Sequence, residues 1–228
     1  MGLRTFLHGD PQASTPGVTI GPARAYEVFS TLVFAGRRRR VFTSLVVLSG
    51  AGPGDQVLDV GCGPGYLTRL AADAVRPGGS ARGIDPSPSV ISYAQHAANH
   101  DSCSFALGVA EKLETADGSM DVVLSSLMMH HLPEDLRPQA LQEMFRVLRP
   151  GGRLLVADFR PPRSRVGRHI VGAVTGSQMQ HNPIDRLEPL VRDAGFDVLD
   201  RGDLKPHLHY VQASRPIATS QGAGDGIG

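Results

Sequence analysis

The chain has 228 residues, of which 41% are hydrophobic and 20% are charged, and its formal net charge is +1. This length predicts one domain with a sizeable core, and the near-neutral charge argues against a basic nucleic-acid-binding coat, so no nucleic-acid partner is expected. No apolar run predicts a transmembrane segment or a secretory signal. The two cysteines, Cys62 and Cys103, are too few for a disulfide framework and indicate reduced thiols in the cytoplasm.

The N-terminal part of the chain divides into two segments. Residues 1–25 are rich in Pro, Gly and Thr, and we expect them to form a flexible lead-in. Residues 26–49 have apolar side chains at helical spacing. The run Arg37–Arg40 lies within this helical segment. It is a candidate contact for a phosphate or a membrane head group, although such a run is more often a solvated helix face.

From residue 56 onward, strand and helix patterns alternate, which predicts βαβ units and a parallel sheet. The Pro-Gly-Gly sequence at residues 150–152 is expected to end the last of the central helices. The expected strands are 56–60, 80–84, 104–107, 121–126 and 154–158, and the expected helices are 66–75, 90–98 and 138–148.

The C-terminal part departs from this rhythm. Residues 160–183 carry Arg, His and scattered apolar side chains, and are expected to form a lid-like insertion over an acceptor pocket or, equally, a solvated excursion. A helix should follow and reach Ala194, with Gly195 as its cap. Residues 196–201 and 208–213 are expected to form a hairpin, and the Gly-rich residues 217–228 to be a disordered tail.

The most informative motif is VLDVGCGPGYLT at residues 57–68, which predicts a buried strand, a Gly-x-Gly-x-Gly turn and a helix. Such glycines let the backbone approach a ligand closely, and the following helix presents free N–H groups. The spacing departs from the dinucleotide fingerprint, because Tyr66 stands where that pattern has its last glycine.

A carboxylate follows at the end of the second expected strand, twenty residues beyond Gly65. Asp85 is placed to accept hydrogen bonds from both hydroxyls of a ribose. The alternative is an ordinary surface Asp before a turn. Because the strand end, the glycine loop and the acid coincide, we favour the ribose role.

Four motifs in this order resemble the class I S-adenosylmethionine-dependent methyltransferases, and among them the small-molecule methyltransferases of the ubiquinone/menaquinone-biosynthesis type. They are VLDVGCGPGYLT, GIDPSPSVISYA, GSMDVVLSSLMMHHL and LQEMFRVLRPGGRLLVADF, and the resemblance covers about residues 25–213. It implies an α/β fold: a Rossmann-like, seven-stranded, mostly parallel sheet with helices on both faces and an antiparallel last strand. Residues 26–216 would form the single domain.

The resemblance also implies a binding site for S-adenosylmethionine. The glycine loop would line the methionine part of the cofactor, Asp59 would orient the loop or reach the amino group, and Asp85 would hold the ribose. Pro86 would flank the adenine, and Tyr26 would close over the cofactor. The implied cofactor-binding residues are Tyr26, Asp59, Gly61, Cys62, Gly63, Gly65, Asp85, Pro86, Val109, Ala110, Glu111, Ser125 and Ser126.

One position departs from the family. The resemblance places an Asp on the adenine side of the pocket where this chain has Val109. Glu111 or the backbone of Ala110 is the candidate to replace that contact.

Transfer of an activated methyl group requires an in-line nucleophile but no metal, and a base near neutral pKa suits a nucleophile that must lose a proton. The candidate bases are His130 and His131, just after the fourth expected strand; the alternative is a capping or packing role. The sequence at Ser125–Met128 lacks the Asn/Asp-Pro-Pro-aromatic stretch of base-directed methyltransferases in this superfamily. A small or lipophilic acceptor is therefore expected, with peripheral membrane contact and homodimer formation both open.

Two other hypotheses compete with a methyltransferase. A non-catalytic S-adenosylmethionine-binding protein is kept open by Val109. A nicotinamide-dependent oxidoreductase would share the Rossmann-like layout, but the non-standard third glycine and the lack of a Tyr-x-x-x-Lys pattern argue against it.

Overall fold

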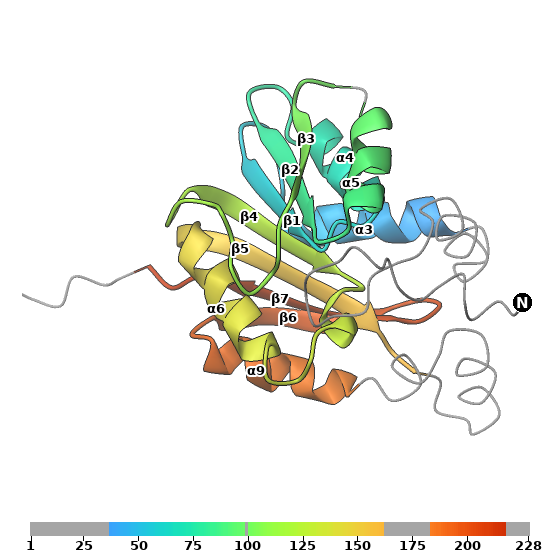
Figure 1. The fold of residues 1–228 in the computed structure, drawn as a ribbon. Coiled ribbons are helices and arrows are strands. Elements are labelled where there is room, and N and C mark those ends of the chain that lie inside the picture. The colour runs from blue at the N-terminus through green and yellow to red at the C-terminus, as the bar shows by residue number, and fades with distance from the viewer. Residues whose placement is uncertain (1–36, 99, 162–182, 218–228) are drawn as a thin grey trace, which may run out of the picture.

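The computed structural model describes residues 37–98, 100–161 and 183–217, which build one seven-stranded sheet between two layers of helices (Figure 1). The strand order is β3-β2-β1-β4-β5-β7-β6. The strands are β1 (Gln56–Val60), β2 (Ser80–Asp85), β3 (Cys103–Leu107), β4 (Met120–Ser126), β5 (Leu148–Phe159), β6 (Asp197–Leu204) and β7 (Leu208–Ser214).

The pairing confirms the expected fold class. Strands β1 to β5 pair in parallel, whereas β7 is antiparallel to both β5 and β6. Helical crossovers join β1 to β2, β2 to β3 and β4 to β5, whereas residues 108–119 connect β3 to β4 without a helix. The short connection at residues 205–207 allows only the antiparallel β6–β7 hairpin. All five parallel strands therefore end at one edge of the sheet, where ligands bind in open α/β folds.

Helices cover both faces of the sheet, as expected (Figure 1). Alternate residues of β1 show the division of the core: Val57 packs with the cluster under one helical layer and Leu58 with the cluster under the other. The first layer holds α3 (Arg38–Ser49), α4 (Tyr66–Ala74) and α5 (Pro88–His96). The second holds α6 (Arg137–Val147), α9 (Leu187–Asp193) and the short 3-10 turns η1 (Met129–His131) and η2 (Ile184–Arg186).

The fifth strand corrects one expectation. It begins at Leu148 rather than Leu154, because Leu148 pairs with Met120 before the register shifts within β4. The Pro-Gly-Gly sequence lies inside β5, where Gly151 has a φ of +78°. The helix does end just before it, at Val147, but these residues form an irregular start of the strand rather than a separate turn.

The C-terminal elements match their predictions more closely. Helix α9 ends at Asp193, Gly195 has a φ of +97°, and the hairpin follows. Tyr26, the expected lead-in, most of the expected lid-like insertion and the tail from residue 218 lie outside the described residues. In the part of the chain that the structure describes, no helix has the length and apolar character needed to cross a membrane.

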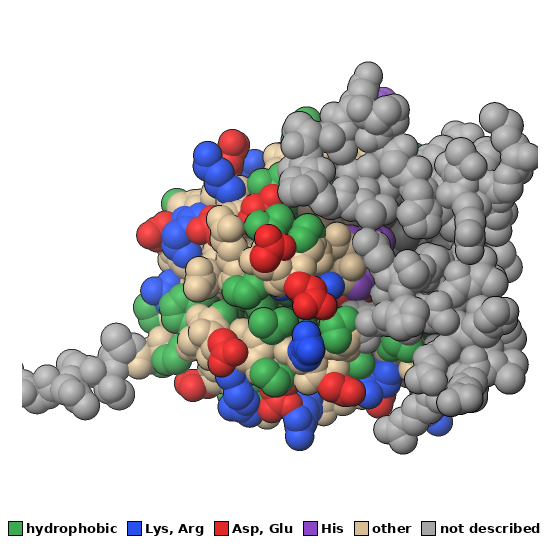
Figure 2. Space-filling model, turned by 60° about the horizontal axis from the view of Figure 1, so that its bottom comes forward, with side chains coloured by type: hydrophobic (Ala, Val, Ile, Leu, Met, Phe, Trp, Pro, Cys, Tyr) green, Lys and Arg blue, Asp and Glu red, His purple; other side chains and the backbone are tan. Residues whose placement is uncertain are grey.

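The face formed by α6 and α9 carries basic and acidic side chains in an interspersed arrangement (Figure 2). Several of them pair locally: Arg146 with Glu143, and Arg192 and Arg201 with Glu188. Exposed pairs of this kind contribute little stability. The chain as a whole has nearly equal numbers of the two signs, with 23 basic and 22 acidic residues.

Candidate functional site

The glycine loop lies where β1 ends, and its shape requires three glycines. Gly61, Gly63 and Gly65 have φ values of +73°, +52° and +76°, which L-residues with a Cβ rarely adopt. The backbone N–H groups of Gly61 and Cys62 both donate to the carbonyl oxygen of Ile84 at 2.9 Å. The loop is thereby fixed across the ends of β1 and β2.

Packing imposes a second requirement on the same glycines. A Cβ on Gly61 would overlap the side chain of Met128, and a Cβ on Gly65 would overlap the ring of Phe105. Glycine is therefore required at these two positions partly by packing within the protein and not only by the approach of a ligand. The face of the loop that remains open lines a pocket, described below.

Asp85 ties the glycine loop to the end of β2. Its side chain is buried, with 8% of the residue exposed. One carboxylate oxygen accepts a hydrogen bond from the Gly63 N–H at 3.1 Å, and the other accepts one from the Ser87 N–H at 3.0 Å. Burial raises the pKa of Asp85 more than these two hydrogen bonds lower it. Each oxygen keeps a second acceptor position for a ligand hydroxyl.

Asp59 lies deeper, one residue before the end of β1, and is 1% exposed. It accepts a hydrogen bond from the Thr68 hydroxyl of α4 at 2.6 Å. Burial raises its pKa to about 7, and the bond from Thr68 offsets only part of that effect. A carboxylate in this state gains strongly from a nearby positive charge.

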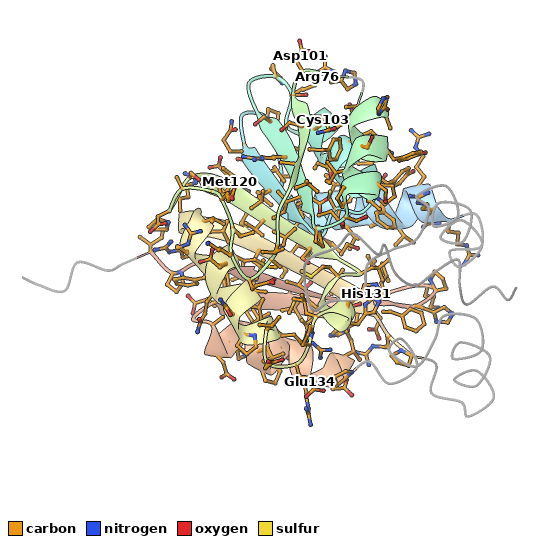
Figure 3. All side chains as sticks on the ribbon, viewed as in Figure 1. Arg76, Asp101, Cys103, Met120, His131 and Glu134 are labelled. Carbon is orange, nitrogen blue, oxygen red and sulfur yellow. The ribbon has the colours of Figure 1, made fainter. Side chains whose placement is uncertain are left out.

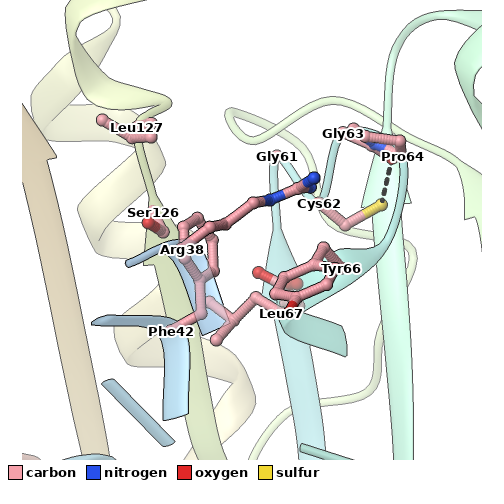
Figure 4. Close-up of a pocket in the computed structure, with 11 residues that line it drawn as sticks. Arg38, Phe42, Gly61, Cys62, Gly63, Pro64, Tyr66, Leu67, Ser126 and Leu127 are labelled. Atoms are coloured by element: carbon pink, nitrogen blue, oxygen red, sulfur yellow. Dashed lines mark hydrogen bonds between the residues drawn. The ribbon is translucent and has the colours of Figure 1, made fainter. Parts of the chain in front are cut away.

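A pocket opens beside Asp59 and the glycine loop (Figure 4). Ser126 contributes a buried hydroxyl oxygen with no hydrogen-bond partner among the described residues. The lining residues come from α3, β1, the glycine loop, α4 and the end of β4: Arg38, Phe42, Asp59, Gly61, Cys62, Gly63, Pro64, Tyr66, Leu67, Ser126 and Leu127.

Two features of the pocket wall were not predicted as parts of a site. The guanidinium of Arg38 lies 4.1 Å from the centre of the Tyr66 ring, and Phe42 meets the same ring edge to face at 5.5 Å. On the opposite wall, Leu127 has a φ of +58°. A left-handed conformation at a residue with a branched side chain costs energy and often marks a functional site.

A His–Asp pair occupies the other half of the carboxyl edge, on the α6 side of the sheet. His130 Nδ1 lies 2.6 Å from Asp158 Oδ1, and the His130 backbone N–H donates to Asp158 Oδ2 at 2.9 Å. Both residues are almost fully buried. Burial would raise the pKa of Asp158, but the charge and hydrogen bonds of His130 outweigh it and the pKa is lowered.

The geometry of the pair determines which ring nitrogen is available. An ionised carboxylate only accepts hydrogen bonds, so Nδ1 of His130 must donate. His130 Nε2 has no hydrogen-bond partner within the described part of the chain. His131 is its neighbour, with ring centroids 4.0 Å apart, at the carboxyl edge of the sheet (Figure 3).

The structure distributes the expected site residues over three groups. Asp59, Gly61, Cys62, Gly63 and Ser126 line the pocket. The second group is not part of the pocket lining: Gly65, Asp85, Pro86 and the loop Val109–Glu111, whose preceding residue Gly108 donates its N–H to the carbonyl of Asp85 at 3.2 Å. The third group lies on or toward the α6 side: Ser125, His130 and His131.

Sequence reasoning missed Asp158 and the pocket residues Arg38, Phe42, Tyr66 and Leu127. An available signal for Asp158 was its place at the end of a buried strand, the same position that identified Asp85. Arg38 had no such signal, because only the docking of α3 shows which Arg of the run faces inward.

The comparisons with known proteins agree with this fold. A family model described as a methyltransferase domain matches residues 57–152. A crystal structure of an S-adenosylmethionine-dependent methyltransferase from Aquifex aeolicus superimposes with a TM-score of 0.64, covering 86% of this chain and 100% of that chain at 19% identity. At this identity the likeness establishes the fold alone.

Three curated relatives are similar in sequence. The malonyl-[acyl-carrier protein] O-methyltransferase of Hahella chejuensis is 34% identical over 161 residues, covering 67% of this chain and 56% of that protein. The arsenite methyltransferase of Halobacterium salinarum is 34% identical over 157 residues, covering 65% of this chain and 39% of that protein. The demethylmenaquinone methyltransferase of Symbiobacterium thermophilum is 33% identical over 147 residues, covering 63% and 58%. The chain thus spans about half the length of the curated relatives that it matches.

Fold and site together define a class I methyltransferase fold with its glycine loop and strand-end carboxylate in place. Residues 57–152 match a family model described as a methyltransferase domain, in agreement with the resemblance seen in the sequence.

Proposed function

We propose that this protein transfers a methyl group from S-adenosylmethionine to a small or lipophilic organic acceptor. The observation that carries the proposal is the buried carboxylate of Asp59 in the pocket beside the glycine loop, with a pKa raised to about 7. An acid in this state is suited to a cationic ligand, and S-adenosylmethionine carries both an ammonium and a sulfonium group.

Other features of the pocket fit the same cofactor. The Ser126 hydroxyl lacks a partner among the described residues, and the backbone of the glycine loop lets a ligand approach closely. Asp85 retains acceptor positions for two ribose hydroxyls. When bound, the cofactor supplies a methyl group already activated on sulfur. Asp59, the glycine loop, Asp85 and Ser126 would hold it in place.

We propose His130 as the group that removes a proton from the acceptor, with Asp158 as its positioning residue. Asp158 holds Nδ1 as the donor, which leaves Nε2 with the lone pair that can take a proton. His131, the second candidate of the sequence analysis, lies beside it. A buried, oriented imidazole of this kind contributes roughly 10²- to 10⁴-fold to a rate that needs general-base catalysis.

We also propose a cytoplasmic location and an acceptor other than nucleic acid. The near-zero net charge and the interspersed charges of the α6–α9 face support this choice, because a phosphate backbone selects clustered cations. The names of the relatives suggest the first acceptors to test: demethylmenaquinone, arsenite and malonyl-acyl carrier protein.

Binding of S-adenosylhomocysteine, measured by titration calorimetry, tests the cofactor site. The wild-type protein should bind, and Asp85→Ala should bind at least about tenfold more weakly because it loses charged hydrogen bonds. Asp117→Ala, at an exposed position in the loop before β4, is the matched control. No heat at millimolar ligand would refute the cofactor, and a thermal shift with a nicotinamide cofactor instead would favour the oxidoreductase.

Methyl transfer to the three acceptors, followed by mass spectrometry, separates an enzyme from a non-catalytic binder. With an acceptor in hand, His130→Gln should lower kcat about 100-fold or more while the affinity for S-adenosylhomocysteine stays unchanged. An unchanged kcat in His130→Gln would remove His130 from the mechanism and leave His131 as the candidate base.

A further inference from the structure

Side chains of α6 hold the backbone of the connection from β3 to β4, which itself contains no helix (Figure 1). Glu143 accepts a hydrogen bond from the Leu113 N–H at 2.8 Å. Arg146 donates to the carbonyl oxygens of Leu113 and Thr115, both at 2.9 Å. Two side chains of one helix therefore fix both polar backbone groups of Leu113 and the carbonyl of Thr115.

These two side chains also hold each other. Arg146 donates to both carboxylate oxygens of Glu143 at 2.8 Å, and this two-pronged contact fixes the orientation of both groups. The hydrogen bond from Arg146 holds the pKa of Glu143 below its usual value, so the carboxylate accepts from Leu113 as an ion. Arg146 also pairs with the exposed Asp117, but its bonds to the two carbonyl oxygens do not depend on that carboxylate.

Gln139 adds a third contact, nearer in sequence to the end of β3. Its side-chain amide donates to the carbonyl oxygen of Glu111 at 3.1 Å. Positions 139, 143 and 146 are separated by steps of four and three, which places their side chains in one row along the helix. We call Gln139, Glu143 and Arg146 the α6 polar row.

The part of the connection nearest to β3 is a tight turn beside Asp85. The Lys112 N–H donates to the Val109 carbonyl at 3.3 Å, and the Gly108 N–H donates to the Asp85 carbonyl at 3.2 Å. Ala110 is 8% exposed and packs in the same core cluster as the apolar side of α6. The turn is thus tied to β2 where it begins and to the α6 polar row where it ends.

A nucleoside whose ribose is bound by Asp85 would place its base beside this turn. The glycine loop lies at the end of β1, on one side of Asp85, and Leu107 at the end of β3 lies on the other. In a nucleoside thioether, the sulfur and the base are attached on opposite sides of the ribose ring oxygen. With the sulfur beside the glycine loop, the base is expected at residues 109–112. Backbone amides and the Glu111 carboxylate can supply hydrogen bonds to its edge there.

We propose that Gln139, Glu143 and Arg146 are positioning residues for base recognition, because they hold the turn at residues 109–112 in the shape that selects adenine. The assignment rests on the proposed function and extends it to a helix that is not expected to touch the cofactor. The row acts through the backbone of the turn. Its loss should therefore lower the selectivity between bases, and not the affinity for every part of the nucleoside.

The test compares two ligands on the same variants by titration calorimetry. S-adenosylhomocysteine carries adenine, and S-inosylhomocysteine carries hypoxanthine on the same sugar and amino-acid group. The wild-type protein should bind the adenine ligand at least about tenfold more tightly. Arg146→Met should weaken the adenine ligand about tenfold and the hypoxanthine ligand no more than about threefold. Glu143→Gln keeps the shape of the side chain and should reduce the selectivity less than Arg146→Met does.

Gln139→Ala and Gln142→Ala form a matched pair, because both remove an exposed glutamine from the same helix. Gln139→Ala should lower the selectivity about two- to threefold, whereas Gln142→Ala should leave it unchanged. A thermal melt of each variant confirms folding, and the exposed Gln139 keeps the test available if Arg146→Met does not fold.

Equal weakening of both ligands in the row variants would overturn the proposal, since it would show that the row only supports the fold. A wild-type protein that binds the two ligands equally well would overturn it too, with the cofactor still bound. If the wild-type protein bound neither ligand, the proposed function itself would fail.

Discussion

Asp59 and Asp158 are both 1% exposed at the carboxyl edge of the same sheet, yet their pKa values shift in opposite directions. Asp59, in the glycine-loop half, has one hydroxyl donor from Thr68. Asp158, in the β4–β5 half, accepts hydrogen bonds from the His130 ring, the His130 backbone and the Phe159 backbone. Burial acts alike on both carboxyls, so the difference comes from their partners.

The two carboxyls differ in whether the protein itself supplies a group that stabilises their negative charge. The protein itself provides the imidazole that stabilises the charge of Asp158. In the glycine-loop half, a ligand is expected to provide the positive charge that stabilises Asp59. We therefore interpret the β4–β5 half, with Asp158, as preorganised, and the glycine-loop half, with Asp59, as completed only when a ligand binds.

The largest loss of stability should come from removing the carboxylate of Asp158. Asp158→Ala leaves the ring and backbone donors of His130 buried without an acceptor, and should lower the free energy of unfolding at pH 7 by about 3 to 5 kcal/mol. Urea denaturation measures this loss. Asp117→Ala, whose side chain is 79% exposed beside Arg146, should cost less than about 1 kcal/mol. Equal losses in the two variants would contradict the description of the His130 pair.

The next effect concerns Asp59 and depends on pH. Because its native pKa of about 7 lies above its ordinary value of 3.8, the folded state holds the proton more tightly. Stability should therefore fall as the pH rises from about 4 to about 7. Asp59→Asn cannot ionise and should gain stability relative to the wild-type protein over that range, by at most about 4 kcal/mol at about 1.4 kcal/mol per pH unit.

Chemical denaturation at several pH values measures this difference. Thr68→Val sharpens the test, because it removes the hydroxyl that lowers the pKa of Asp59 and should shift the window to higher pH. If the difference in the free energy of unfolding between the wild-type protein and Asp59→Asn did not vary with pH, the pKa of Asp59 would not be raised in the folded state.

A smaller effect tests the contact between the two halves. Gly61→Ala places a Cβ against Met128 in a left-handed backbone conformation and should cost about 2 to 4 kcal/mol. Gly54→Ala also has a positive φ but nothing within 4 Å, and should cost about 1 kcal/mol. Thermal or urea unfolding measures the loss of stability in each variant. Equal losses in Gly61→Ala and Gly54→Ala would mean that the glycine loop and Met128 do not pack together.

The smallest expected effect is the loss, at acid pH, of the stability that the ionised carboxylate of Asp158 contributes. Its native pKa is lowered, so its contribution is present above its ordinary pKa of 3.8 and is lost as the pH falls through the native value. The difference in stability between the wild-type protein and Asp158→Asn should therefore narrow below about pH 4. This trend has the opposite sign to that of Asp59. A difference that widens in acid would contradict the assignment.

Much of the fold could be predicted because each element carried its own local signal. The strand of β1, the glycine turn, and the Gly195 cap depend on residues close in sequence, and all were located within a few residues. The start of β5 was misplaced because Pro150-Gly151-Gly152 is a strong local turn signal. The pairing of Leu148 with Met120 is a tertiary effect that overrode it.

The site was predictable to a lesser degree. Asp59 and Asp85 were found because they flank a recognisable loop. The partnership of Asp158 with His130 joins residues 28 positions apart, and the inward orientation of Arg38 depends on how α3 docks against α4. Neither the length nor the composition of these segments contains that information.

The contact between Gly61 and Met128 has a mechanical consequence. The space that a Cβ would fill at Gly61 is occupied by Met128, which directly precedes the turn carrying His130. Any displacement of the glycine backbone toward β4 must move this methionine, and the imidazole lies only two residues further along. Such a displacement would be passed by steric contact to the start of the turn that carries His130.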